Sequence, residues 1–215
     1  IAGTEEAFAQ LLNKKAAELG MKNSHFVNAS GWPDPNHYST PHDLAIMARA
    51  LIRDYPEEYK IYSQKEFTYN GIKQGNRNPL LYSYPGADGV KTGHAEEAGY
   101  GVIGSAVMGD RRVILVINGT QSMQERADES RKLMDWSLRN FKNVEIAKKG
   151  TVYAEAPVLI GLAETVPLTV AQNVKMTLPA MSGSDVKVQA SFKGPLIAPV
   201  QAGTTVGELI IEVPN

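Results

Sequence analysis

The sequence predicts an α/β (α+β) fold over residues 1–143, an antiparallel sheet packed with helices, followed by a small all-β sandwich domain over residues 144–215. Three observations lead to this prediction. Apolar residues recur at helical spacing early in the chain and again after residue 122. Between these segments, two β-branched runs are joined by a short turn, which is typical of an antiparallel hairpin. After residue 143 no helical period survives, and short β-type runs alternate with Pro and Gly.

Two helices are expected near the start of the chain. The first covers Thr4–Leu19, with Thr4 as the N-cap and Gly20 after the last turn. Its apolar face consists of Phe8, Leu11, Leu12, Ala16 and Leu19. The second opens at Thr40, with Pro41 in its first position and Asp43 near the positive end of the helix dipole. It runs through Leu44, Met47, Ala48 and Leu51.

The middle of the chain predicts a hairpin followed by a third helix. Residues 55–87 are expected to form turns and short strands. The runs Tyr100–Met108 and Arg112–Ile117, joined at Gly109-Asp110, form the expected hairpin. Ser122 and Glu125 then have the spacing of a capping box. The buried stripe of this helix is expected to be Ala127, Met134, Leu138 and Phe141.

The last part of the chain has the pattern of a β domain without helices. Its expected strands are Val158–Ile160, Val166–Val170, Val174–Leu178, Val186–Phe192 and Val206–Val213. These short runs, and the Pro and Gly that break them, favour a sandwich.

Composition excludes several classes of function. The chain has 22 basic and 23 acidic residues and no long run of one sign, so it has no electrostatic footprint for a nucleic-acid partner. Cysteine is absent, which removes disulfides, thiolate catalysis and cysteine-bound zinc, and is compatible with either a reducing compartment or export. The histidines His25, His37 and His42 lack metal-ligand spacing and are interpreted as structural. Trp32 and Trp136 are interpreted as packing residues.

Lys91-Thr92-Gly93 is the most suggestive tripeptide for chemistry, although alone it also fits an exposed lysine before a turn. Its surroundings, Asp88 to His94 followed by Ala98-Gly99-Tyr100 and the hairpin, closely resemble the Lys-Thr-Gly region of the low-molecular-weight penicillin-binding proteins, the serine D-alanyl-D-alanine carboxypeptidases. Further segments resemble the same family in the same order along essentially the whole chain. They are Phe26-Val27-Asn28 with Gly31, Tyr38-Ser39-Thr40 with Asp43-Leu44-Ala45, Asn76-Arg77-Asn78 with Leu80-Leu81, and Gly119 with Arg126 and Glu129-Ser130.

The resemblance implies a transpeptidase/β-lactamase-like domain and a role for each matching residue. Lys91 would place an ammonium beside the reacting hydroxyl groups, and Thr92 would offer its hydroxyl to the terminal carboxylate of the substrate. Gly93 would leave room for the substrate backbone along the strand. The backbone N–H of His94 would complete the oxyanion hole. Arg126, in the first turn of the third helix, would give the carboxylate a second, charge-assisted contact. Ala95 departs from the family, where a hydroxyl residue is common.

The nucleophile of that family is missing from this sequence. Its Ser-x-x-Lys and Ser-x-Asn motifs precede the segment that resembles Thr4–Leu19, and the chain begins at Ile1. The only Ser-x-x-Lys match, Ser184-Asp185-Val186-Lys187, falls in the β domain and is interpreted as coincidence. No Ser-x-Asn or Gly-x-Ser-x-Gly occurs. The chain alone therefore cannot acylate, and we expect the missing N-terminal segment either as a second chain or ahead of Ile1.

The function implied by the resemblance is removal of the terminal D-alanine from peptidoglycan pentapeptides through an acyl-serine intermediate, in the periplasm on the outer face of the bacterial cytoplasmic membrane. The expected partners are stem peptides ending in D-Ala-D-Ala and β-lactam antibiotics, with no metal or organic cofactor. Membrane contact is expected only through a C-terminal amphipathic anchor, which this sequence lacks. The alternatives are a β-lactamase or D,D-endopeptidase, and a non-catalytic wall-binding or scaffolding homologue.

Overall fold

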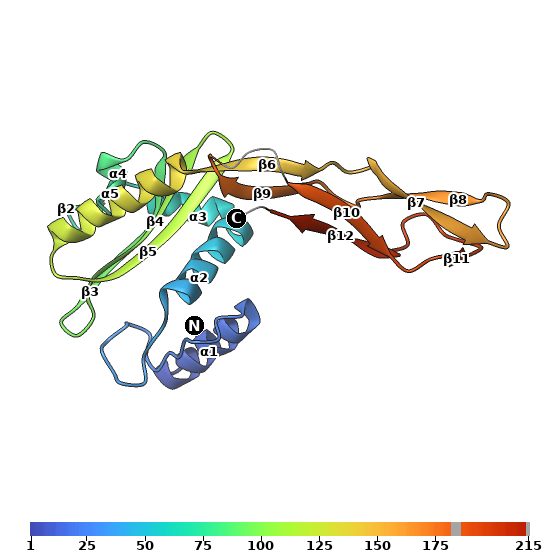
Figure 1. The fold of residues 1–215 in the computed structure, drawn as a ribbon. Helices are drawn as coiled ribbons and strands as arrows, with labels where there is room; N and C mark the ends of the chain where they lie inside the picture. Colours follow the sequence, from blue (N-terminus) through green and yellow to red (C-terminus); the bar gives the residue numbers. More distant parts are fainter. Residues whose placement is uncertain (182–185, 214–215) are drawn as a thin grey trace. The chain divides into compact units, whose positions relative to one another are not determined.

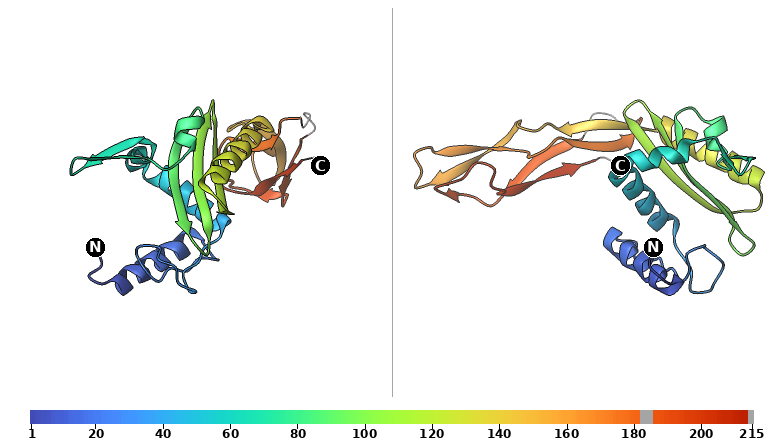
Figure 2. Two further views of the ribbon diagram at one scale, coloured as in Figure 1. Left: turned by 90° about the vertical axis from the view of Figure 1, so that its left-hand side faces the viewer. Right: turned by 180° about the vertical axis from the view of Figure 1, so that it is seen from behind.

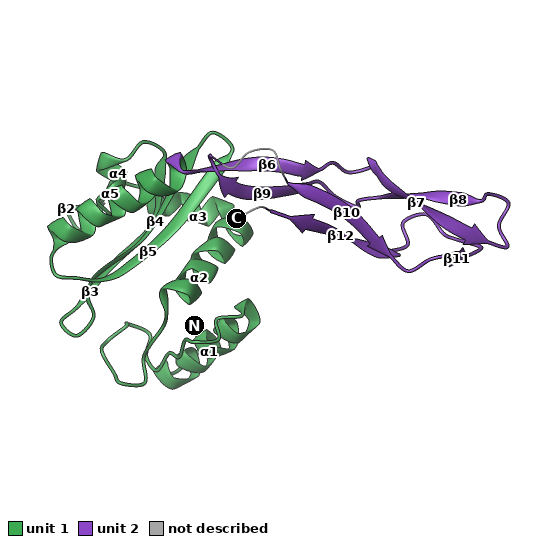
Figure 3. Ribbon diagram, viewed as in Figure 1, with its two compact units in different colours: residues 1–138 green, residues 139–215 purple. Residues whose placement is uncertain are grey.

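The computed structural model describes residues 1–181 and 186–213, which divide into two compact units, residues 1–138 and 139–215 (Figure 3). The boundary expected after residue 143 falls within strand β6 (Phe141–Ala147). This strand pairs with β9 (Val174–Pro179), so its first residues belong with the second unit. None of the helices in the described ranges is long and apolar enough to cross a bilayer.

A three-stranded antiparallel sheet forms the centre of the first unit. It consists of β3 (Ala87–Ala95), β4 (Gly99–Met108) and β5 (Arg111–Thr120), in the order β3-β4-β5 (Figure 1). The predicted hairpin is confirmed, because Met108 pairs with Arg111 across the turn at Gly109. Gly109 has φ 61°, a conformation that glycine adopts without steric cost.

Helices pack on both faces of this sheet (Figure 2). The helix α5 (Met123–Arg139) and the short α4 (Leu80–Ser83) cover one face, where Val102, Ala106 and Leu115 of the sheet contact Leu80, Met134 and Leu138. The helices α2 (Pro41–Asp54) and α3 (Pro56–Tyr59) cover the other face, where Ala48 and Tyr59 contact Val90 and Ile103. The α/β part of the predicted fold class is confirmed.

Both N-terminal helices begin where the sequence predicts. In α1 (Glu5–Leu19) the Thr4 hydroxyl accepts a hydrogen bond from the Ala7 N–H at 3.1 Å, and Gly20 ends the helix with φ 82°. In α2 the Thr40 hydroxyl accepts from the Asp43 N–H at 3.2 Å. The predicted apolar faces are partly wrong, because Leu11 and Met47 are exposed. The buried positions are mostly alanines, while Leu44 and Leu51 of the predicted α2 face are partly buried and pack against the core.

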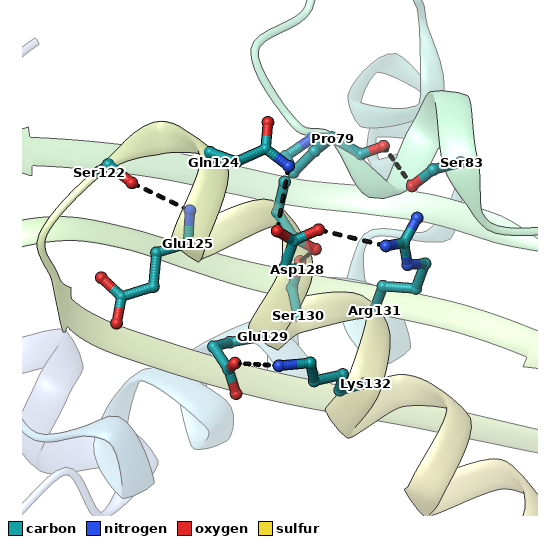
Figure 4. Close-up of polar contacts among 11 residues, drawn as sticks. Pro79, Ser83, Ser122, Gln124, Glu125, Asp128, Glu129, Ser130, Arg131 and Lys132 are labelled. Carbon is teal, nitrogen blue, oxygen red and sulfur yellow. Dashed lines mark hydrogen bonds and ion pairs between the residues drawn. The ribbon is translucent and has the colours of Figure 1, made fainter.

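The third helix, α5, also begins as predicted, with a modified capping box. The Ser122 hydroxyl accepts from the Glu125 N–H at 3.0 Å (Figure 4). The Glu125 carboxylate in turn accepts from the Gln121 N–H at 2.6 Å. Charged pairs such as Glu129–Lys132 occupy its outer face. Phe141 is not part of the buried stripe, because the helix ends at Arg139 and Phe141 opens β6.

Residues 55–87 contain short helices that the sequence did not predict. The short strands are confirmed as the hairpin of β1 (Glu66–Tyr69) and β2 (Ile72–Gly75). Around it lie α3, the 3-10 turn η1 (Lys60–Ser63) and α4, each of four residues. A helix of one turn is too short for apolar periodicity to reveal it.

From Phe141 onwards, the regular elements among the described residues are all strands. The strand β7 (Val152–Leu159) pairs with β8 (Thr165–Thr169) on one side and with β11 (Leu196–Ile197) on the other. The strand β10 (Lys187–Phe192) pairs with β12 (Gly207–Glu212). Four of the five predicted runs overlap β8, β9, β10 and β12, and the fifth, Val158–Ile160, overlaps only the end of β7. The strand β6 was missed because three charged or amide residues interrupt its apolar pattern.

The buried carboxylate of Asp43 ties the loop before α2 to the start of that helix. It is 1% exposed and accepts hydrogen bonds from the Asn23 N–H at 2.7 Å and the Ser24 hydroxyl at 2.8 Å. Burial by itself would raise the pKa of the Asp43 carboxyl, but the bonds from Ser24 and Asn23, with a contribution from His42, lower the pKa below its usual value. The ionised form is therefore the one that the fold stabilises.

We predict that Asp43→Asn lowers the melting temperature of the intact protein by several degrees at pH 7. Because the pKa is lowered in the folded state, the stabilisation is complete above the unfolded pKa of about 4 and is lost as the pH falls through the folded pKa. Melting curves between pH 2 and pH 7 should thus show a shallower acid limb in Asp43→Asn than in the wild type. Equal slopes would contradict this account.

Candidate active site

A hollow of about 840 Å³ lies in the first unit, along the C-terminal part of β3 and the adjoining part of β4. Its walls come from the loop before α2, from α2 itself, from the segment before α4, from all three strands and from the start of α5. The lining residues that the following argument uses are Arg77, Lys91, Thr92, Gly93, Tyr100 and Arg126. This volume suits a small organic ligand or the end of a peptide.

The strand β3 directs Lys91 and Thr92 to opposite faces of the sheet. Thr92 pairs with Val102, which packs under α5, whereas Lys91 pairs with Ile103, which packs under α2. Two residues further along β3, His94 has its ring centre 3.9 Å from that of Tyr100, and the Arg126 Cζ lies 5.7 Å from the same Tyr100 ring, so His94 is on the α5 side. Thr92 is two residues before His94, so its side chain lies on the α5 side as well. Both residues still line the same hollow.

Around Gly93 the strand is open, and the His94 ring contacts that of Tyr100 at a tilt of 36°. A Cβ placed on Gly93 would meet no atom within 4 Å, so neither the fold nor the backbone conformation demands glycine there. The imidazole of His94 lies 3.9 Å from the Tyr100 ring, centroid to centroid. The Lys91 ammonium donates a hydrogen bond to the Thr92 carbonyl.

Arg126, presented by the first turns of α5, is a buried cation that has no anionic partner in the described part of the chain. Its side chain reaches only carbonyl oxygens, those of Gly93 and Gly101 at 3.5 Å and that of Arg77 at 3.4 Å. The residue is 5% exposed, its Nε has no partner, and no carboxylate among residues 1–181 and 186–213 pairs with it. Burial lowers the pKa of the guanidinium, an effect partly opposed by Tyr100, whose ring centre lies 5.7 Å from its Cζ.

The charge in the hollow is entirely positive. Arg77, Lys91 and Arg126 line it, and no aspartate or glutamate does among the described lining residues. The N-terminus of α5, which includes the lining residue Met123, adds the positive end of a helix dipole. Three cations and a dipole around one cavity favour an anionic ligand, and a carboxylate fits guanidinium geometry best when it is held bidentately.

All five residues singled out from the sequence, Lys91, Thr92, Gly93, His94 and Arg126, line this hollow, as does the departing Ala95. Arg77 was missed as a site residue, although its tripeptide Asn76-Arg77-Asn78 was among the family segments. The only sign of Arg77 in the sequence is this polar tripeptide between β-type runs, and such a tripeptide alone predicts a loop rather than a binding residue. Ser184 of the Ser-x-x-Lys match lies outside the described residues. No described group of three or more His, Asp or Glu side chains is placed to hold a metal ion.

The two tryptophans were predicted as packing residues, and this prediction is wrong. Trp32 is 76% exposed and Trp136 is 53% exposed. The loop of Trp32 is held by Asn28, whose side-chain oxygen accepts from the Gly31 and Trp32 N–H groups at 2.8 and 3.1 Å. Its neighbours Ser30 and Gly31 line the hollow. Trp136 lies on the outer side of α5, between the buried Met134 and Leu138.

We predict that Arg126→Gln does not lower the melting temperature of the intact protein, because the wild-type guanidinium is desolvated without a compensating carboxylate. The change should leave the melting temperature equal or raise it, as measured by differential scanning calorimetry. A structural control is Arg112→Gln, which removes a cation that is paired with Asp88 at 2.7 Å. This change should lower the melting temperature. A melting temperature several degrees lower in Arg126→Gln would contradict this prediction, because it would show that the folded protein itself compensates the charge of Arg126.

Known families and proteins match this chain along nearly its whole length. Residues 1–122 match the family model described as D-alanyl-D-alanine carboxypeptidase, and residues 141–215 match the penicillin-binding protein 5 C-terminal domain. The chain is 40% identical over 210 residues to the D-alanyl-D-alanine carboxypeptidase DacA of Escherichia coli (strain K12), covering 97% of this chain and 52% of that protein. It therefore spans about half the length of the curated relatives it matches.

Two solved structures extend this comparison. Penicillin binding protein 5 from Haemophilus influenzae superposes with a TM-score of 0.89 at 37% identity, covering 99% of this chain and 63% of that one. Penicillin-Binding Protein D2 from Listeria monocytogenes, in its ampicillin-bound form, superposes with a TM-score of 0.56 at 36% identity, covering 60% of this chain and 54% of that one. The similarity to the first structure spans both units, and it confirms the predicted fold class.

Proposed function

The chain belongs to the D-alanyl-D-alanine carboxypeptidase family, and from that premise we propose that the whole protein removes the terminal D-alanine from peptidoglycan pentapeptides through an acyl-serine intermediate. The observation that carries the proposal is the buried Arg126, a cation without a carboxylate partner among the described residues. It lines a hollow whose charged lining residues, as far as the structure describes them, are all positive. A free C-terminal carboxylate is the feature that separates a carboxypeptidase substrate from an internal peptide bond.

In this proposal the residues of the hollow bind and orient the substrate. Arg126 and the Thr92 hydroxyl hold the terminal carboxylate from the α5 side of the sheet, and Arg77 adds a third donor group. The substrate backbone lies along β3 at Gly93, where no side chain obstructs it. The His94 N–H stabilises the negative charge that develops on the carbonyl oxygen. These contacts align the scissile bond for attack.

The nucleophile and its proton acceptor come, in this proposal, from a segment outside the given sequence. The chain spans about half of the relatives' length, and it has no Ser-x-x-Lys within residues 1–181. Lys91 lies on the opposite face of β3 from Thr92 and tunes the protons of the reacting hydroxyl groups from there. A serine that attacks the carbonyl would form an ester with the penultimate D-alanine and release the last one, and water would then hydrolyse the ester.

β-Lactams are proposed as inhibitors that occupy the same hollow, since their carboxylate and reactive carbonyl imitate the end of the peptide. The ampicillin-bound Listeria relative supports this. The substrate is part of the cell wall, so the proposed location is the periplasm, on the outer face of the cytoplasmic membrane.

The experiment that tests the proposal uses the full-length protein, with a fluorescent penicillin and a pentapeptide ending in D-Ala-D-Ala. We predict a covalent penicillin adduct and release of free D-alanine, both reduced about a hundredfold or more in Lys91→Gln. Lys73→Gln, at an exposed lysine of the β1–β2 hairpin paired with Glu66, should behave as the wild type. No adduct and no D-alanine from a protein that contains its own Ser-x-x-Lys would refute the proposal, and rapid release of hydrolysed penicillin would instead indicate a β-lactamase.

A second prediction separates a glycine needed by the substrate from one needed by the fold. Gly93→Ala should leave the melting temperature within about one degree of the wild type, because the new Cβ meets no atom within 4 Å, yet lower the rate of penicillin acylation about tenfold or more. Gly104→Ala is the contrast, because its Cβ would lie 2.5 Å from Leu80 and 3.1 Å from Leu115. That overpacking should cost about 1–3 kcal/mol of unfolding free energy. Full acylation activity in Gly93→Ala would contradict the proposed position of the substrate backbone along β3.

A further inference from the structure

The strand β3 contains one extra residue three positions before Lys91. Ala87 pairs with Ala106 and Gly89 pairs with Ser105, so Asp88 has no partner on β4 and forms a bulge. One inserted residue shifts the pairing of the residues that follow it in the strand by one position. Val90 departs from the alternation of faces, because it pairs with Gly104 and packs on the α2 side, and the pairing continues through Lys91 and Thr92. With the bulge, Thr92 pairs with Val102 and lies on the α5 side. In a regular strand counted from Ala87, Lys91 would take that pairing instead.

The bulge therefore decides which side chain Arg126 faces. In the observed register the neutral Thr92 hydroxyl lies on the same face as this guanidinium. In the regular register the Lys91 ammonium would lie there, and two cations would repel each other in a poorly solvated wall. The carboxylate site and the placement of Lys91 on the opposite face both depend on the insertion at Asp88.

A polar cluster holds the Asp88 side chain in place across the whole sheet. Arg112 of β5 donates to both carboxylate oxygens of Asp88, at 2.7 and 2.9 Å, and to the Ser105 hydroxyl of β4 at 2.6 Å. The Tyr59 hydroxyl donates to Asp88 at 3.0 Å. Burial raises the pKa of Tyr59 to about 12, so its hydroxyl remains a donor at neutral pH. Ser105 is fully buried.

Gly89, the residue after the bulge, is held by a hydrogen bond from the segment before α4. The amide of Asn78, which is fully buried, donates to the Gly89 carbonyl at 2.8 Å and accepts from the Leu80 N–H at 3.1 Å. A Cβ on Gly89 would lie 2.4 Å from the Tyr59 hydroxyl, so a side chain there would expel the tyrosine. Asp88 and Gly89 are thus held by groups from α3, from the segment before α4, and from β4 and β5.

We propose that Asp88 is a positioning residue, whose bulge, held by Arg112 and Tyr59, sets the register that places Thr92 rather than Lys91 beside Arg126. This inference rests on the proposed function, because it gives the register a purpose in holding a carboxylate. Asp88 itself touches no substrate in this account and acts through the strand.

The test compares two buried tyrosines that each donate to a carboxylate, in the full-length protein. Tyr59 bonds Asp88, whereas Tyr84 bonds Asp135 at 3.1 Å and packs in the core on the α5 side. The readout is the ratio of kcat/KM for a peptide ending in free D-Ala-D-Ala to kcat/KM for the same peptide with a C-terminal amide. We expect Asp88→Asn to lower this ratio about tenfold and Tyr59→Phe to lower it about threefold, with no change in Tyr84→Phe.

A merely structural role for Asp88 would lower the activity on both peptides equally and leave the ratio at its wild-type value, and that result overturns the inference. If Asp88→Asn does not fold, the contrast between Tyr59→Phe and Tyr84→Phe decides.

A wild-type protein that processes neither peptide overturns the proposed function. In that case the register is read from cross-strand NOEs between Thr92 and Val102, which should weaken in Asp88→Asn and persist in Tyr84→Phe. Unchanged NOEs in Asp88→Asn would show that the contacts of Asp88 with Arg112 and Tyr59 do not set the register, and would overturn the inference.

Discussion

The candidate site depends on one uncompensated charge, the guanidinium of Arg126. Burying a cation without an anion costs free energy, and proteins normally avoid it by pairing or by keeping the group at the surface. Here the residue is 5% exposed, and within residues 1–181 and 186–213 its guanidinium reaches only carbonyl oxygens, at 3.4–3.5 Å. A ligand carboxylate would supply the missing partner. The remaining features, from the bulge in β3 to the start of α5, serve to hold this group and Thr92 at one hollow.

Local sequence signals predicted the framework of the first unit well. Helix starts at Thr4, Thr40 and Ser122 were predictable because each cap is a short-range interaction between a side chain and a nearby N–H. The hairpin at Gly109 was predictable because a tight turn between two β-type runs needs a residue that tolerates a positive φ. Burial was less predictable, since it depends on what packs against a helix. Leu11 lies at the helical spacing of an apolar face and is nevertheless exposed.

The identity of the site residues was predicted mainly from the family resemblance, whereas only the structure shows that they lie around one hollow. No local pattern indicates that Arg126, on a helix, would reach the carbonyls of Gly93 and Arg77, which are 33 and 49 residues away along the chain. The bulge at Asp88 was equally hidden, because it arises from contacts with Arg112 and Tyr59 that are distant in sequence. Its effect is large all the same, as a single inserted residue exchanges the faces of Lys91 and Thr92.

The most direct test of the central claim is a crystal structure of the full-length protein with a non-covalently bound peptide ending in D-Ala-D-Ala. The account predicts that the terminal carboxylate lies within hydrogen-bond distance, about 3 Å, of both the Arg126 guanidinium and the Thr92 hydroxyl. A peptide bound in the hollow with its carboxylate in solvent, and Arg126 still contacting only carbonyl oxygens, would contradict the account.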